Sequence, residues 1–280
     1  MIENNQLRIT AQAKKYYDEN IDSLIKFAKK NNYYYKYLLE LLKFIIPKNK
    51  RILDVGCGIA GFLKELQPSF GLGIDISEKV IVYNQQKYSD LNFQVCDCQT
   101  DKIEGKYDYI LVNNLIGDLE DIWLCLRNLK NNCSQDTKIV IIYYNQFWEP
   151  ILSLAQALGL KMKQPPQNWL NFKDIKNLLY LNGFEIVKSG YDCIFPFNFP
   201  ILSNCINKIF SNLPYFHRLN LITWIVAKPA HEPVKAQNQY SVSVIIPCKN
   251  EVDNIEGAVY RTPNMGLHTE LIFIDGHSTD

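Results

Sequence analysis

Short apolar runs alternate with helical stretches from residue 51 to residue 145, and this alternation most limits how the chain can fold. Apolar runs at 51–55, 70–75, 92–97, 107–113 and 138–145 predict strands, and the segments 58–67, 77–88 and 119–132 predict helices. Strands that alternate with helices build right-handed βαβ units. The sequence therefore predicts an α/β fold, a doubly wound parallel sheet with helices on both faces.

The flanking segments extend this pattern. Helical periodicity at 17–46, ended by Pro47, predicts one or two amphipathic helices before the first strand. Later segments predict helices at 150–162, 171–182 and 201–213 and strands at 184–190 and 221–229. A polar, proline-bearing stretch follows, and a new strand begins at residue 242. We therefore expect one domain at 1–230, a linker at 231–240 and the start of a second domain at 241–280.

Composition restricts the partners and the compartment. The chain has 280 residues and a net charge of +1, which gives no general attraction to nucleic acid, so no nucleic-acid partner is expected. Its apolar runs are far shorter than the ~20 residues of a membrane helix, so no transmembrane segment is expected. The eight cysteines show no metal-ligand spacing, and the N-terminus lacks the pattern of a secretory signal. These features predict free thiols, no metal site and a cytoplasmic location.

A glycine-rich turn joins the first predicted strand to the first predicted helix. Gly56 and Gly58 allow a tight turn and let the backbone approach a ligand, and Gly61 allows the helix to pack close to the strand. In an open parallel sheet this turn lies at the carboxyl ends of the strands, where ligands bind.

Two acids beside the turn point to the kind of ligand. Asp75 ends the second strand and can accept hydrogen bonds from both ribose hydroxyls of an adenosine cofactor. Asp54 would repel a pyrophosphate but attract the ammonium and sulfonium of S-adenosylmethionine. Alternatively, Asp54 caps the turn through backbone N–H groups.

From about Tyr16 to Pro229 the chain resembles the class I S-adenosylmethionine-dependent methyltransferases. The segments ILDVGCGIAG, GIDIS, FQVCDCQ and YDYILVNNLIGDLED resemble their motifs, in order and at strand ends. The resemblance implies a Rossmann-like, seven-stranded sheet with the last strand antiparallel and an N-terminal helical extension. The cofactor-binding residues that the turn, the acids and the resemblance together predict are Asp54, Gly56, Cys57, Gly58, Gly61, Asp75, Ile76, Asp97, Cys98, Asn113 and Asn114.

The catalytic group is less clearly indicated. Many family members that act on small molecules carry an acid and a histidine after the fourth strand, where this chain has Asn-Asn-Leu-Ile-Gly-Asp. Asp118 and His217 are the candidate bases, ahead of Tyr16 and Tyr17. Residues 147–169 form a candidate acceptor-side insertion whose Trp148, Asn168 and Trp169 would suit stacking on a sugar or ring.

Residues 241–280 resemble the first βαβ unit of family-2 glycosyltransferases, which use nucleotide sugars. The resemblance places Pro247, Asn250 and Glu251 against the nucleoside, Asp275 against the base and Asp280 at the last acid of that motif. The chain ends before the remaining parts of such an enzyme, so we expect this segment to be poorly packed and inactive alone.

Together these features predict an enzyme that transfers a methyl group from S-adenosylmethionine to a small-molecule, saccharide or lipid-linked glycan acceptor. The glycan acceptor follows only by association with the glycosyltransferase segment. Two alternatives stay open: an NAD-dependent oxidoreductase, and a non-catalytic methyltransferase-fold module that supports a glycosyltransferase.

Overall fold

The computed structural model describes residues 3–59, 61–165, 167–197, 199, 202–211, 213–230 and 240–280. The chain divides into two compact units, Met1–Ala230 and His231–Asp280, each described here by itself. A bilayer-crossing helix is absent from the described part of the chain.

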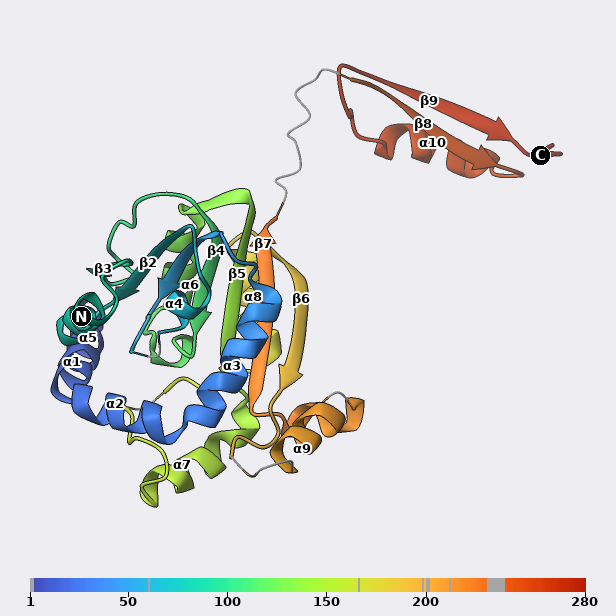
Figure 1. Cartoon of the computed structure of the whole chain (residues 1–280). Helices are drawn as coiled ribbons and strands as arrows, with labels where there is room; N and C mark the ends of the chain where they lie inside the picture. Colours follow the sequence, from blue (N-terminus) through green and yellow to red (C-terminus); the bar gives the residue numbers. More distant parts are fainter. Residues whose placement is uncertain are drawn as a thin grey trace. The chain divides into compact units, whose positions relative to one another are not determined.

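The first unit is built on one seven-stranded sheet (Figure 1). The strand order is β3-β2-β1-β4-β5-β7-β6, and β7 is antiparallel to both of its neighbours. This confirms the predicted fold class, with its last strand antiparallel. The strands are β1 (Arg51–Val55), β2 (Phe70–Asp75), β3 (Asn92–Val95), β4 (Tyr107–Asn113), β5 (Cys133–Tyr144), β6 (Phe184–Asp192) and β7 (Ile222–Pro229).

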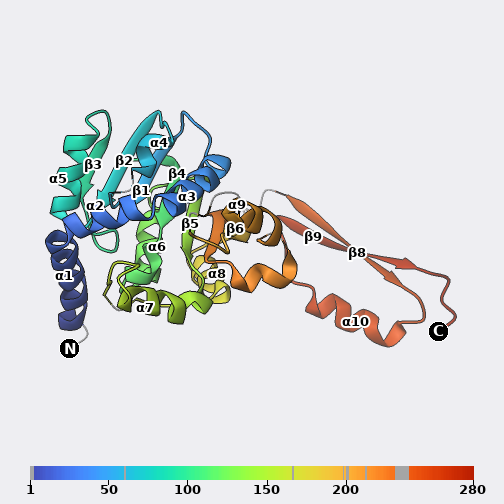
Figure 2. The same cartoon turned by 60° about the horizontal axis from the view of Figure 1, so that its bottom comes forward.

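Helices lie on both faces of this sheet, as Figure 2 shows from a second direction. Ser77 and Asp121 cap two of them by accepting the backbone N–H of Val80 and Leu124. The helices are α1 (Glu3–Glu19), α2 (Ile21–Lys30), α3 (Asn32–Ile45), α4 (Phe62–Glu65), α5 (Glu78–Lys87), α6 (Ile122–Lys130), α7 (Glu149–Ala157), α8 (Phe172–Leu181) and α9 (Leu202–Phe210).

One helix prediction agrees with the structure and another needs correction. The segment 17–46 contains two helices, α2 and α3, within the predicted one or two, and α1, which ends at Glu19, was not predicted. The helix predicted at 58–67 is only the four-residue α4, because Gly58 and Gly61 adopt positive φ angles of 48° and 71°. A right-handed helix cannot continue through such residues, so the loop before α4 is longer and its backbone is more open.

Two hydrophobic clusters fill the space between the sheet and its helices. Successive residues of a strand point to opposite faces of the sheet. In β4, Ile110 therefore belongs to the cluster with α6 and α8, and Leu111 belongs to the cluster with α3 and α4. Both side chains are fully buried. Burial on both faces explains why the central strands are nearly continuous apolar runs. The carboxyl ends of β1, β2 and β4 are thereby fixed side by side.

The second unit contains β8 (Ser241–Cys248), α10 (Val252–Arg261) and β9 (His268–Asp275). The two strands pair in parallel, from Ser241 opposite His268 to Cys248 opposite Asp275. Residues 240–280 include no buried residue, and Ile245 remains 60% exposed. This agrees with the expectation of a poorly packed βαβ segment.

Candidate cofactor and acceptor site

The glycine turn after β1 leaves open space at its centre. Gly56, Gly58 and Gly61 all have positive φ, at 65°, 48° and 71°. A Cβ added to Gly58 would meet no atom of the described residues within 4 Å, whereas one added to Gly56 would lie 2.8 Å from the Leu115 side chain. Gly56 therefore permits the loop after β4 to approach, and Gly58 keeps a cradle open.

Asp75, at the end of β2, is hydrogen-bonded to this turn. Its Oδ2 accepts the backbone N–H of Gly58 at 3.0 Å, and its Oδ1 accepts that of Ser77 at 3.0 Å. Burial raises the pKa of Asp75. Each carboxylate oxygen can accept a second hydrogen bond, so the group can still receive two ribose hydroxyls.

Asp54 is the most unusual acid in the site. Its side chain is only 3% exposed, and none of the described residues donates a hydrogen bond to its carboxylate. Burial, and then the charge of Asp75, raise the pKa of Asp54 to about 7. No N–H of the described turn residues donates to Asp54, so the structure does not support the alternative in which Asp54 caps the turn. A cation placed beside Asp54 would favour its ionised form.

The cofactor pocket, as we name it, opens between the turn and the ends of β2 and β3. Four carboxylates line it, which favours a cationic ligand and disfavours a pyrophosphate. Of the predicted residues it contains Gly56, Asp75, Ile76, Asp97, Cys98 and Asp118. Sequence reasoning missed Thr10, Ala13, Cys96, Gln99, Leu119 and Glu120, and it proposed Tyr17 only as a base.

Helix α1 forms one wall of this pocket. Tyr17 donates its hydroxyl to Asp118 Oδ2 at 2.8 Å. Asp18 accepts the hydroxyl of Ser77 at 2.6 Å and the backbone N–H of Lys79 at 3.2 Å. Burial, with Asp118 next, raises the pKa of Tyr17 well above its ordinary value, so Tyr17 acts as a donor and is poorly suited to be a base.

The loop after β4 brings unsatisfied amide oxygens to the site. Asn114 adopts a left-handed conformation, with a φ of 53°, and donates its Nδ2 to the Tyr34 hydroxyl at 3.2 Å. The side-chain oxygens of Asn113 and Asn114 are buried and have no hydrogen-bond partner among the described residues. Strain and orphaned acceptors of this kind concentrate at ligand sites.

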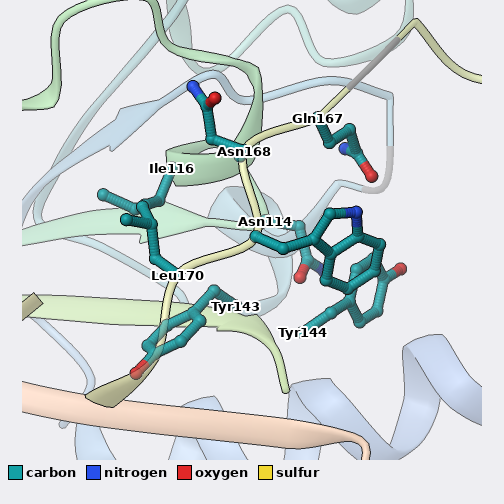
Figure 3. A pocket seen from close by; sticks show the side chains of 9 residues that line it. Asn114, Ile116, Tyr143, Tyr144, Gln167, Asn168 and Leu170 are labelled. Atoms are coloured by element: carbon teal, nitrogen blue, oxygen red, sulfur yellow. The ribbon is translucent and has the colours of Figure 1, made fainter. Parts of the chain in front are cut away.

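A second pocket, which we name the transfer pocket, adjoins the cofactor pocket at Asp118. The Asp118 Oδ1 accepts the Nε2 hydrogen of Gln167 at 2.8 Å, and burial raises the pKa of Asp118. Figure 3 shows the lining side chains around this pocket. They are Asn114, Ile116, Gly117, Tyr143, Tyr144, Gln167, Asn168, Trp169 and Leu170.

Lys161 is a charged residue near this pocket that no motif indicated. Its ammonium lies 5.3 Å from the centre of the Tyr144 ring. Burial lowers the pKa of Lys161 to about 8, and the charge of Asp118 partly opposes that change. Lys161 lies beyond the end of α7, although the sequence predicted a helix as far as residue 162, so its placement is decided by tertiary packing.

Comparison with known proteins connects this geometry to a family. A family model described as a methyltransferase domain matches residues 27–189. The chain belongs to this family of methyltransferase domains. It is 33% identical over 70 residues to "Putative methyltransferase 235L" of Invertebrate iridescent virus 6, which is 24% of this chain and 26% of that protein. The match thus spans about a quarter of the curated relative.

Solved structures share the fold of this methyltransferase domain. A magnesium protoporphyrin IX methyltransferase of Synechocystis PCC 6803 with bound SAH aligns with a TM-score of 0.54 at 15% identity, covering 79% of this chain and 100% of that one. A SAM-dependent methyltransferase of Thermotoga maritima aligns with a TM-score of 0.58 at 12% identity, covering 77% and 99%. The predicted cofactor agrees with the family and with these proteins.

Six predicted residues of the methyltransferase domain line neither pocket: Asp54, Cys57, Gly58, Gly61, Asn113 and His217. Cys57 is buried, and its backbone N–H bonds to the Ile74 carbonyl at 2.9 Å. Gly61 is the left-handed residue that begins α4. Both shape the turn. His217 lies in a 3-10 helix (Pro214–Leu219) and stacks on the Tyr191 ring, with centroids 5.4 Å apart. Its assignment as a base stays a prediction.

In the second unit, the predicted nucleotide-sugar residues come from neighbouring loops. Asn250 Oδ1 accepts the backbone N–H of Thr279 at 2.9 Å, and Asp280 accepts that of Val252 at 3.0 Å. Pro247 lies in β8, Glu251 precedes α10, and Asp275 ends β9. Hydrogen bonds therefore hold the turn after β8 against the segment after β9.

Proposed function

We propose that this chain transfers the methyl group of S-adenosylmethionine to a small-molecule, saccharide or lipid-linked glycan acceptor. The observation that carries the proposal is the acid-lined cofactor pocket beneath an open glycine turn. A cofactor with a sulfonium and an ammonium suits this charge, whereas the pyrophosphate of a nicotinamide cofactor does not. The family match supports the same choice over the oxidoreductase alternative.

The residues present fit such a cofactor in three parts. Asp54 and the orphaned oxygens of Asn113 and Asn114 would receive the ammonium of the methionine end. Asp75 would receive the ribose hydroxyls. Asp97 and Cys98 would lie at the adenine, at the outer end of the pocket.

The main task of the protein in this reaction is to align the acceptor with the methyl group. When bound, S-adenosylmethionine supplies an already activated methyl group. The chain's own residues orient the acceptor in the transfer pocket and exclude water, with α1 covering the cofactor pocket. Asp118 lies where the two pockets meet, and its raised pKa suits it to take the proton of an acceptor hydroxyl. Tyr17 and Gln167 hold its two oxygens in place.

Parallel titrations with S-adenosylhomocysteine (SAH) and NADH test this proposal. Saturating SAH should stabilise the full chain by about 2–4 kcal/mol, and NADH should have no effect. Asp75→Ala should abolish the SAH effect. Stabilisation by NADH alone would support the oxidoreductase. Binding of S-adenosylmethionine without methyl transfer to any acceptor would support the non-catalytic module.

We also propose that residues 241–280 begin a family-2 glycosyltransferase domain after a linker at 231–240. The parallel βαβ arrangement and the joined loops at Asn250 and Asp280 support this. In amide NMR spectra, uridine diphosphate should perturb residues 248–251 and 275–280. Perturbation elsewhere only, or none, would refute the assignment. The cytoplasmic location stays a prediction.

A further inference from the structure

An open groove beside the transfer pocket carries two cations and four aromatic rings, one of them Tyr143. We name it the acceptor groove and define it by Phe147, Phe172, Lys173, Tyr191 and Arg218. It encloses about 420 Å³, which is within the range of small-molecule sites.

The acceptor groove continues the path that begins at the cofactor pocket. Tyr143 and Leu170 line both the acceptor groove and the transfer pocket. The transfer pocket in turn meets the cofactor pocket at Asp118, through its bond to Gln167. A molecule in the groove could therefore extend one end toward Asp118 while its other end remains among the groove's cations.

Neither cation of the groove is held in an ion pair among the described residues. Within the described ranges, no carboxylate lies at ion-pair distance from Lys173 or Arg218. Asp174, the nearest acid along the chain, is held by the backbone N–H of Asn171 at 3.0 Å as part of the cap of α8. Two exposed cations that lack a counter-charge favour an anion between them.

The aromatic rings supply flat surfaces next to these cations. Phe147 is 52% exposed, and the Arg218 guanidinium lies 6.0 Å from its ring centre. Across the groove, the Phe172 and Tyr191 rings lie 6.5 Å apart. The exposed face of Phe147 beside this concave site is suited to stack on a ring of the ligand.

We infer that the methyl acceptor is a small molecule with a ring and an anionic group, a carboxylate or phosphate, bound in the acceptor groove by Lys173 and Arg218. This rests on the proposed function, because it assigns the substrate class of that same site. It also narrows the acceptor, since neutral sugars and neutral aromatics would leave both cations unpaired.

Binding of matched anionic and neutral probes to the full chain tests the inference. The pairs are phenyl phosphate with phenol, benzoate with benzamide, and glucuronate with glucose, each titrated with and without saturating SAH. At least one anionic probe should bind about tenfold or more tightly than its neutral partner, and added salt should weaken it. The phosphate and carboxylate pairs distinguish the two anion types.

Variants locate the binding. Lys173→Gln combined with Arg218→Gln should weaken the anionic probe about tenfold or more and leave SAH binding unchanged. The matched control is Lys36→Gln with Arg127→Gln: Lys36 is exposed, and Arg127 lies over Trp123 at 5.1 Å much as Arg218 lies over Phe147. The control should change neither affinity.

The outcomes separate the two levels of the argument. If SAH fails to bind the wild-type chain, the proposed function fails. If SAH binds but the anionic probes bind no better than their neutral partners, only the inference fails. Equal loss of probe binding in the control variant would likewise overturn the groove as the anion site.

Discussion

Replacing Asp54 by asparagine removes a carboxylate that is 3% exposed and lies near the charge of Asp75. The two side chains have nearly the same shape, so the change mainly removes a buried charge. Burial makes the ionised carboxylate unfavourable in the unliganded protein, whereas the proposed cofactor binds to that negative charge. We therefore expect Asp54→Asn to make the unliganded protein more stable and to weaken its binding of SAH.

The pKa of Asp54 gives the size and the pH dependence of this effect. A rise from the ordinary value of about 4 to about 7 corresponds to about 4 kcal/mol against the ionised carboxylate, an upper estimate. Because the folded state prefers the protonated form, the cost is absent below about pH 4, grows between about 4 and 7, and is constant above. Asp54→Asn should thus stabilise the protein by up to about 4 kcal/mol at about pH 8 and by much less at about pH 4.5.

Urea unfolding across this pH range measures the change in stability, and SAH titrations on the same samples measure the change in SAH affinity. SAH should bind Asp54→Asn about tenfold or more weakly, through loss of a charge-assisted contact to the ammonium. Asp136→Asn makes the same chemical change at an exposed site and should alter neither quantity. The reasoning is refuted if the stability difference between Asp54→Asn and wild type does not grow with pH, or if SAH binds both equally.

Three further changes probe other parts of the site. Gly58→Ala and Gly159→Ala both place alanine at a positive φ with open space around it. Each should lower the unfolding free energy by about 1 kcal/mol. Calorimetry should show weaker SAH binding only for Gly58→Ala. Equal SAH affinity in both would show that the turn does not cradle the ligand. Asp118→Asn should lower kcat about 100-fold or more with a hydroxyl acceptor while SAH binds as before, and unchanged turnover would remove Asp118 as the base. Tyr17→Phe should reduce SAH affinity by a few fold in the same titration, because it releases α1 from Asp118, and an unaltered affinity would argue against a closing role for α1.

The sheet and the turn were predictable because each depends on local sequence. β1, β2 and β4 occupy the predicted residues, since buried strands need apolar runs and glycines mark the turn. α4 was overestimated because helical periodicity does not reveal that Gly58 and Gly61 take positive φ. Helix α1 was missed because its polar N-terminal sequence has no clear apolar face.

Some contacts of the site depend on long-range packing that local sequence does not reveal. Gln167 reaches Asp118 across 49 positions of sequence, and Tyr17, which was proposed only as a base, reaches it across 101. Lys161 lies beyond the point where the predicted helix at 150–162 ends in the structure, and Arg218 lies outside every predicted element, so no local pattern indicates their direction. Motifs identify residues next to the glycine turn. The lining of the transfer pocket instead depends on the conformation of the loop between α7 and α8, which sequence patterns do not predict.

The most direct measurement of the central claim is a crystal structure of the chain with SAH. It should show the amino-acid end of SAH beside Asp54 and the loop after β4, its ribose hydroxyls on Asp75, and its adenine near Asp97. SAH bound away from the glycine turn, or in the turn with its ribose out of reach of Asp75, would contradict the account.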